Sequence, residues 1–209
     1  GLILALAIMA IAQNIGLTRD KEVARLETIA DLKSRRITEW LGNREQDLRQ
    51  ILDNPSYGAL SLSGQRDRPS DEQTQRLIEF ISVRGFDGAA LFDRTGQALW
   101  QTPGASIMNA TLRDALTRAT AGKVLRVGPY LDEQGQTRFD FLTPLATAAG
   151  PAPIIVLQIS GSHWVNQILN PWPIPDSSGE ATLFRQHADQ VQYLSDLRYR
   201  PDSALRLQL

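Results

Sequence analysis

The residues best suited to hold a small molecule are Arg138 and Asp140, two positions apart in residues 136–145, QTRFDFLTPL. We predict a strand here, and because successive side chains of a strand point to opposite faces, these two share one face. The planar fork of an arginine suits a carboxylate, and an aspartate suits an ammonium or hydroxyl group. Tyr130 and Trp100 are further candidates to line the same space. The alternative is a solvated salt bridge across that face, worth about 0–1 kcal/mol.

Residue patterns for catalysis or metal binding are absent from the sequence. The chain has no cysteine and two histidines, His163 and His187, without the spacing of a zinc-protease helix. Neither the GxSxG pattern nor a phosphate-binding GxxxxGK[ST] loop occurs. His163 lies beside two serines in SGSHWV, which could suggest a nucleophile, but a surface turn after a strand is the simpler interpretation. We therefore expect a protein that is not an enzyme and has neither a metal site nor a cofactor, with an extracytoplasmic hydrolase as the remote alternative.

Charge and composition are those of an ordinary globular protein. The 209 residues carry a net charge of -1, and 42% of them are hydrophobic. Because no basic segment is present, nucleic acid is not an expected partner.

The segment Leu26–Leu52 is the element around which the chain is organised. On a helical wheel its apolar residues gather on one side, which predicts a long amphipathic helix ending before Pro55. Gly42 is its weak point, and Lys33 and Arg44 project from the apolar side. These two cations need carboxylate or carbonyl partners, must extend to water, or contact a ligand. The apolar stripe consists of Val23, Leu26, Ile29, Ala30, Ile37, Trp40, Leu41, Leu48, Ile51 and Leu52.

Residues 1–12, GLILALAIMAIA, are uncharged, and the first charge is Arg19. A membrane-spanning helix needs about 20 apolar residues, so we interpret residues 1–17 as the end of such a helix, continuous with the amphipathic one. The alternatives are a buried core helix or the remnant of a signal peptide.

The middle of the chain changes from helical to strand periodicity. We predict a helix from residue 70 to about 83, closed by Gly85, and a second helix at about 112–121. Asp93 and Asp132 adjoin turns and are interpreted as turn residues. This order indicates an α+β fold with a mostly antiparallel, PAS-like sheet and helices on one side. The predicted strands are 86–93, 97–102, 124–127, 136–145 and 154–159.

A proline-rich connector, residues 170–179, precedes a last hairpin pattern at 181–185 and 191–195. Roughly 30 residues cannot bury an independent core, so we interpret residues 180–209 as the start of an incomplete second domain.

Several of these segments together resemble the extracytoplasmic double Cache sensor regions of bacterial membrane-anchored histidine kinases and diguanylate cyclases. The resemblance rests on the long helix, on Gly128-Pro129-Tyr130, on the run 141–145, FLTPL, on strand 154–159 and on the connector with the segment after it. The amino-acid-binding branch of this family carries a tyrosine, arginine, tryptophan and tyrosine constellation before its first strands. Nothing similar occurs around residues 80–86, which argues against a free amino acid as the ligand.

The resemblance implies a ligand-sensing domain in the periplasm, anchored in the inner membrane by its N-terminal helix and passing ligand state to a cytoplasmic effector. It implies a stalk helix at 18–54, a membrane-distal Cache domain at 55–169 and a membrane-proximal one beginning at 180. A small molecule such as an organic acid is the expected ligand, held on the face opposite the long helix, and a homodimer is the expected assembly. The alternative is a structural or protein-interaction domain of PAS-like fold without a small-molecule ligand.

Overall fold

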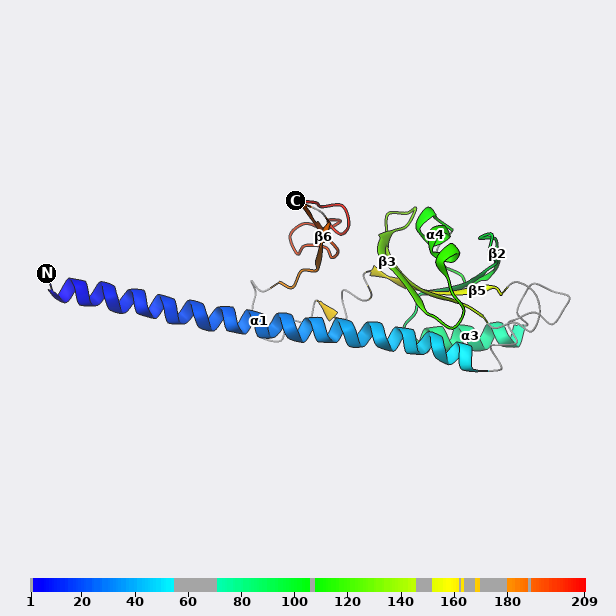
Figure 1. Ribbon diagram of the computed structural model, residues 1–209, viewed down its shortest axis with the longest axis horizontal. Coiled ribbons are helices and arrows are strands. Elements are labelled where there is room, and N and C mark those ends of the chain that lie inside the picture. Colours follow the sequence, from blue (N-terminus) through cyan, green and yellow to red (C-terminus); the bar gives the residue numbers. More distant parts are fainter. Residues whose placement is uncertain are drawn as a thin grey trace.

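The computed structural model describes residues 2–54, 71–105, 108–145, 152–161, 163, 168–169, 180–187 and 189–209, with the side chains of 2–17, Asp71, Gln73 and His187 left out. The predicted loop after Pro55 and the connector at 170–179 lie outside the described residues. Figure 1 shows a five-stranded sheet beside the C-terminal half of one very long helix.

Helix α1 runs without interruption over Leu2–Asp53, which is 52 residues or roughly 78 Å at about 1.5 Å per residue. The predicted continuity of the N-terminal segment with the amphipathic helix is therefore confirmed. Its C-terminal part packs on the sheet, where Leu48 and Ile51 are fully buried. Val23 and Leu26 are exposed by 47% and 53%, so the apolar stripe continues beyond the contact with the sheet. Among the residues described with side chains, no helix combines the length and apolar content needed to cross a membrane.

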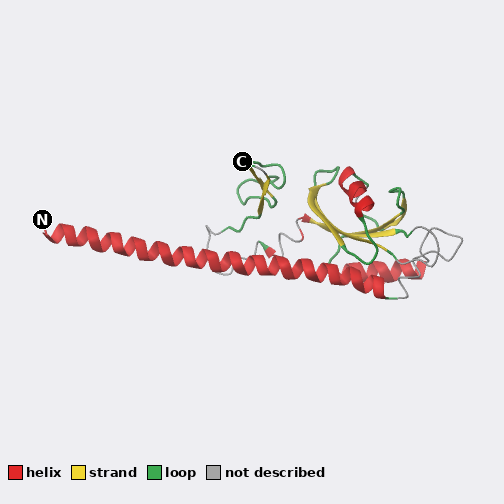
Figure 2. Cartoon of the chain, in the orientation of Figure 1, coloured by secondary structure: helices red, strands yellow, loops and turns green. Residues whose placement is uncertain are grey.

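The sheet is antiparallel throughout, in the order β2-β1-β5-β4-β3. This order brings β5, which comes last in the chain among the strands of this sheet, between β1 and β4. Figure 2 shows the curved sheet with helices on both sides. The elements are α3 (Asp71–Arg84), β1 (Gly88–Phe92), β2 (Ala98–Gln101), α4 (Ala110–Arg118), β3 (Leu125–Leu131), β4 (Thr137–Pro144) and β5 (Ile154–Ser160).

Each face of the sheet has its own apolar core. Phe139 and Phe141 of β4 pack with Leu48, Ile51 and neighbouring residues of α1 and α3. The opposite face packs against α4. The expectation that the helices lie on one side is therefore wrong. The buried residues of α4, which are Leu112, Ala115 and Leu116, form an apolar face that needs its own side of the sheet.

Asp93 and Asp132 stabilise the β1–β2 and β3–β4 turns, as predicted. Oδ1 of Asp93 accepts hydrogen bonds from the backbone N–H groups of Thr95 and Gln97 at 2.9 and 2.8 Å. Oδ1 of Asp132 accepts from those of Gln134 and Gln136 at 3.0 and 2.8 Å. Side chains that mimic turn hydrogen bonds in this way fix the register of the flanking strands.

Strand β3 continues past its predicted end at Val127. Gly128 and Pro129 form an irregularity within the strand, after which Tyr130 pairs with Arg138. Gly128 has a φ of 118°, and a Cβ at this position would lie 2.7 Å from the carbonyl oxygen of Arg138. Only glycine fits there, because it tolerates both the positive φ and the close backbone approach.

The C-terminal segment forms a separate hairpin of β6 (Phe184–His187) and β7 (Gln190–Tyr193). Residues 205–209 add backbone hydrogen bonds to β7. A hairpin was predicted here, at slightly different positions, and the division of the chain into domains stays a prediction. Nη2 of Arg206 donates to the carbonyl of Gly135 in the β3–β4 turn at 3.0 Å, which joins this segment to the sheet.

Candidate ligand-binding site

Asp140 lies at the centre of the sheet and is fully buried, at 0% exposure. It stands opposite Val127 of β3 and Gln158 of β5. Burial raises the pKa of its carboxyl group to about 7, against the lowering effects of the Tyr130 hydroxyl and the Arg138 charge. The alternative of a solvated salt bridge with Arg138 is therefore wrong, because Asp140 has no contact with water.

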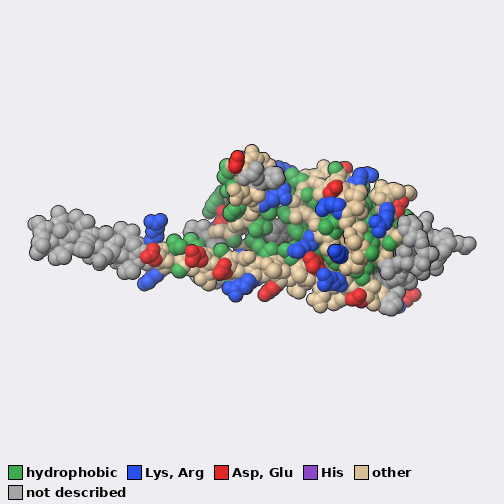
Figure 3. All heavy atoms as spheres, in the orientation of Figure 1, with side chains coloured by type: hydrophobic (Ala, Val, Ile, Leu, Met, Phe, Trp, Pro, Cys, Tyr) green, Lys and Arg blue, Asp and Glu red, His purple; other side chains and the backbone are tan. Residues whose placement is uncertain are grey.

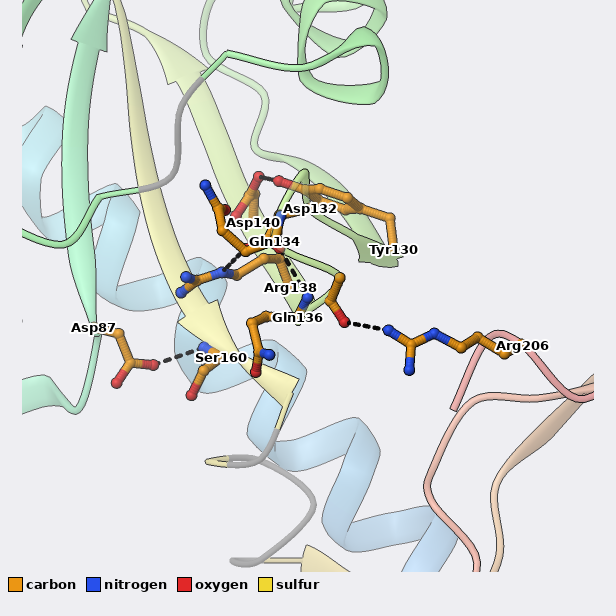
Figure 4. A network of polar contacts seen from close by, with 10 residues as sticks. Asp87, Tyr130, Asp132, Gln134, Gln136, Arg138, Asp140, Ser160 and Arg206 are labelled. Carbon is orange, nitrogen blue, oxygen red and sulfur yellow. Dashed lines mark hydrogen bonds and ion pairs between the residues drawn. The ribbon is translucent and has the colours of Figure 1, made fainter. Parts of the chain in front are cut away.

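Tyr130 is the direct partner of this carboxyl group. Its hydroxyl donates to Oδ2 of Asp140 at 2.5 Å, and Figure 4 shows the two side chains pointing toward each other from adjacent strands. Burial and the Asp140 charge raise the pKa of Tyr130 well above its usual value, so the phenol stays protonated as a donor. Among the described residues, Oδ1 of Asp140 has no hydrogen bond of acceptable geometry. The amide of Gln158 interacts with the carboxylate closely enough to lower its pKa slightly.

Asn109 closes the site from the side of α4. Its Oδ1 accepts a hydrogen bond from the backbone N–H of Leu112 at 2.9 Å, which caps α4. Its amide also interacts with the Tyr130 hydroxyl. Nδ2 of Asn109 is buried without a well-formed hydrogen bond to the described residues. An acceptor on Asp140 and a donor on Asn109 therefore lie on either side of the Tyr130 hydroxyl.

Arg138 lies at the edge of this cluster and is paired elsewhere. Its Nε donates to Oδ2 of Asp132 at 2.8 Å, with the two side chains 17% and 2% exposed. Figure 4 shows this pair beside the Tyr130–Asp140 pair. Because Asp132 also holds the β3–β4 turn, the arginine is attached to a rigid part of the fold. Most of its N–H groups are not used by this contact.

Trp100 does not join the other candidates. It stands opposite Leu91 in the β1–β2 pair and packs with the core that faces α1 and α3. The structure thus brings together Tyr130, Arg138 and Asp140, as predicted, and puts Trp100 on the other side of the sheet. Asn109 was not predicted, although a side chain of this type just before a helix is a recognised capping signal.

No protein-family model and no curated protein sequence matches this chain. Several solved structures do resemble it. The ligand-binding domain of the amino-acid chemoreceptor PctC of Pseudomonas aeruginosa, in complex with GABA, is 19% identical with a TM-score of 0.54, over 87% of this chain and 77% of that one. The PctB domain of the same organism, in complex with L-Gln, is 16% identical with a TM-score of 0.53, over 86% of this chain and 69% of that one.

The extracellular domain of a protein assigned as a histidine kinase, vpHK1S-Z8, has a TM-score of 0.56 at 9% identity, over 87% of this chain and 91% of that one. This chain therefore shares the fold of these ligand-binding and extracellular domains, as the resemblance to Cache sensor regions implied. The antiparallel, PAS-like sheet and the long helix beside it were both predicted from the sequence, whereas the strand order was not. At these identities the likeness concerns the fold.

Proposed function

We propose that this chain is the extracytoplasmic sensor region of a bacterial membrane receptor and binds a small molecule beside Asp140. The observation that carries the proposal is a fully buried carboxyl group with one oxygen lacking a well-formed hydrogen bond. A buried acceptor without such a bond costs about 1–3 kcal/mol, a cost that a ligand can remove. The GABA and L-Gln complexes of the similar structures support a small-molecule site in this fold.

The arrangement of groups suggests the ligand's chemistry. An ammonium or hydroxyl group suits Oδ1 of Asp140, and a carbonyl or carboxylate oxygen suits Nδ2 of Asn109. Arg138, at the edge, offers its remaining N–H groups to a carboxylate. A short hydroxy acid or amino-substituted acid satisfies all three.

Strand β4 connects this site to α1. Arg138 and Asp140 point away from α1. The alternate residues Phe139 and Phe141 point toward α1, and their rings lie 5.9 and 6.1 Å from the ring of Trp40, measured between centroids. A ligand that moves β4 therefore moves side chains packed on α1. We propose that α1 passes this movement through the membrane to a cytoplasmic effector, with two copies of the chain held side by side along its exposed apolar stripe.

The test is a thermal-shift screen of hydroxy, amino and dicarboxylic acids, followed by calorimetry on each hit. Asp140→Asn and Arg138→Gln should each weaken a true ligand by roughly tenfold or more, because each removes a charge-assisted hydrogen bond. Asp114→Asn is the matched control, since Asp114 is an exposed aspartate of α4 that pairs with Arg118. Hits that bind all variants equally would contradict this site. A complete screen without hits would favour the protein-interaction alternative.

A further inference from the structure

A polar cavity lies on the side of the sheet opposite the Asp140 cluster, between α1, the end of α3 and the end of β5. Its volume is about 210 Å³, well above the roughly 30 Å³ that one water occupies in the liquid. Among the described residues, three basic side chains face it and no acidic one does. The cavity is lined by Trp40, Arg44, Val83, Arg84, Gly85, Ile159 and His163.

The acidic partners of these basic side chains are Asp47 and Asp87, neither of which lines the cavity. Asp47, only 2% exposed, contacts Arg84 at 2.7 Å and Arg44 at 3.2 Å. Asp87 lies 3.5 Å from Nδ1 of His163. Because Asp47 and Asp87 lie outside the cavity wall, they hold the arginine and histidine side chains in place while the wall itself stays basic.

The two guanidinium groups are fixed and have donors to spare. Arg44 donates to the carbonyl of Arg84 and lies 5.1 Å above the ring of Phe86. Nη2 of Arg84 donates to Gln50 at 3.0 Å. Each guanidinium carries more N–H groups than these contacts use, and Nε of Arg44 is buried with no hydrogen bond among the described residues. Burial also lowers the pKa of Arg44, which a bound anion would offset.

We propose that this cavity is a second ligand site, which binds a small carboxylate between Arg44 and Arg84. A carboxylate matches the planar guanidinium groups, and its short apolar body matches Trp40 and Ile159 on the cavity wall. The site goes beyond the proposed function, because it lies on the α1 face and shares no residue with the Asp140 cluster. A ligand here contacts α1 and α3 at once and so acts directly on their packing.

The test uses sodium benzoate and sodium acetate as probes of the whole chain, at an ionic strength kept constant with sodium chloride. Benzoate should raise the melting temperature and shift the Nε–H resonance of Arg44 in ¹⁵N spectra. Arg84→Lys keeps a charge beside Asp47 but loses the planar fork, so we expect about tenfold weaker binding. The matched control is Arg126→Lys, because Arg126 pairs with Glu45 of α1 at 2.8 Å and does not line the cavity. The Arg126→Lys variant should bind benzoate as tightly as the wild type.

His163→Gln serves as a second variant in case Arg84→Lys fails to fold, and it should weaken binding severalfold. Equal binding by wild type and both cavity variants overturns the proposal, as does an effect that sodium chloride or phosphate reproduces. Arg138→Gln separates the two sites. If that change alone abolishes benzoate binding, the cavity proposal fails while the function proposed for the Asp140 site survives.

Discussion

At the scale of single residues, the buried Asp140 carboxyl group couples folding to pH. Its pKa is raised from 3.8 to about 7 in the folded chain, so the folded state binds the proton more tightly than the unfolded state. The resulting stabilisation is fully present below about pH 4 and is lost as the pH rises through 7.

We therefore expect the free energy of unfolding to fall between about pH 4 and pH 7, by on the order of 4 kcal/mol in total for this group. Asp140→Asn should largely remove this dependence, because the amide stays neutral and still accepts from Tyr130. Urea unfolding at several pH values measures this pH dependence of the free energy of unfolding. Asp114→Asn should keep the parent's pH profile, and an identical profile for Asp140→Asn would show that another group is responsible.

Part of this cluster could be predicted from the sequence. Strand alternation is enough to place Arg138 and Asp140 on one face, away from Phe139 and Phe141. The actual partners could not be predicted, because the Tyr130–Asp140 contact depends on how β3 passes Gly128 and Pro129. Arg138 pairs with Asp132, which carries a turn signal and no signal for an ion pair.

At the scale of elements, two glycines affect the stability of the fold in opposite ways. Gly128 allows β3 to approach β4, whereas Gly42 lies in the middle of α1 with no neighbouring atom within 4 Å of a Cβ placed there. Gly128→Ala should lower stability by about 2 kcal/mol or more, through positive φ and the contact with the Arg138 carbonyl. Gly42→Ala should raise it by about 0.5–1 kcal/mol, because alanine is the better helix former.

Chemical unfolding of both variants measures these changes. If Gly128→Ala is as stable as the parent, the strand has another way past this position. Gly128 also shows why β3 was predicted too short. A Gly-Pro pair usually ends a strand, and only the backbone shows that this one is accommodated within it. The longer apolar runs, such as 154–159, were predicted correctly because burial on both faces leaves few alternatives.

At the scale of the whole molecule, charges of both signs are mixed, and α1 carries exposed apolar side chains beyond its contact with the sheet. On the face in Figure 3, acidic and basic side chains are mixed over the sheet domain and along α1. Val23 and Leu26 of the apolar stripe are exposed by 47% and 53%. A stripe of this kind on a long helix suits a second parallel copy.

We expect Leu26→Cys to form an oxidative crosslink between two chains reconstituted in lipid vesicles. Thr28→Cys, on another side of α1, should crosslink much less. The chain has no cysteine of its own, so each variant reports one position. Equal crosslinking at both positions would indicate random collision and contradict a dimer along this stripe.

Lys33 attaches α1 to a second part of the chain, residues 168 and 169. Its Nζ donates to the carbonyls of Ile168 and Leu169 at 2.7 and 2.9 Å, and its side chain is buried. Of the fates considered for this cation, pairing with carbonyl groups is therefore the one observed. Ile51 holds α1 to the sheet eighteen residues further on (51 minus 33), or five turns along the same side at 3.6 residues per turn. Attachment at two positions along the same side therefore opposes rotation of α1 about its own axis.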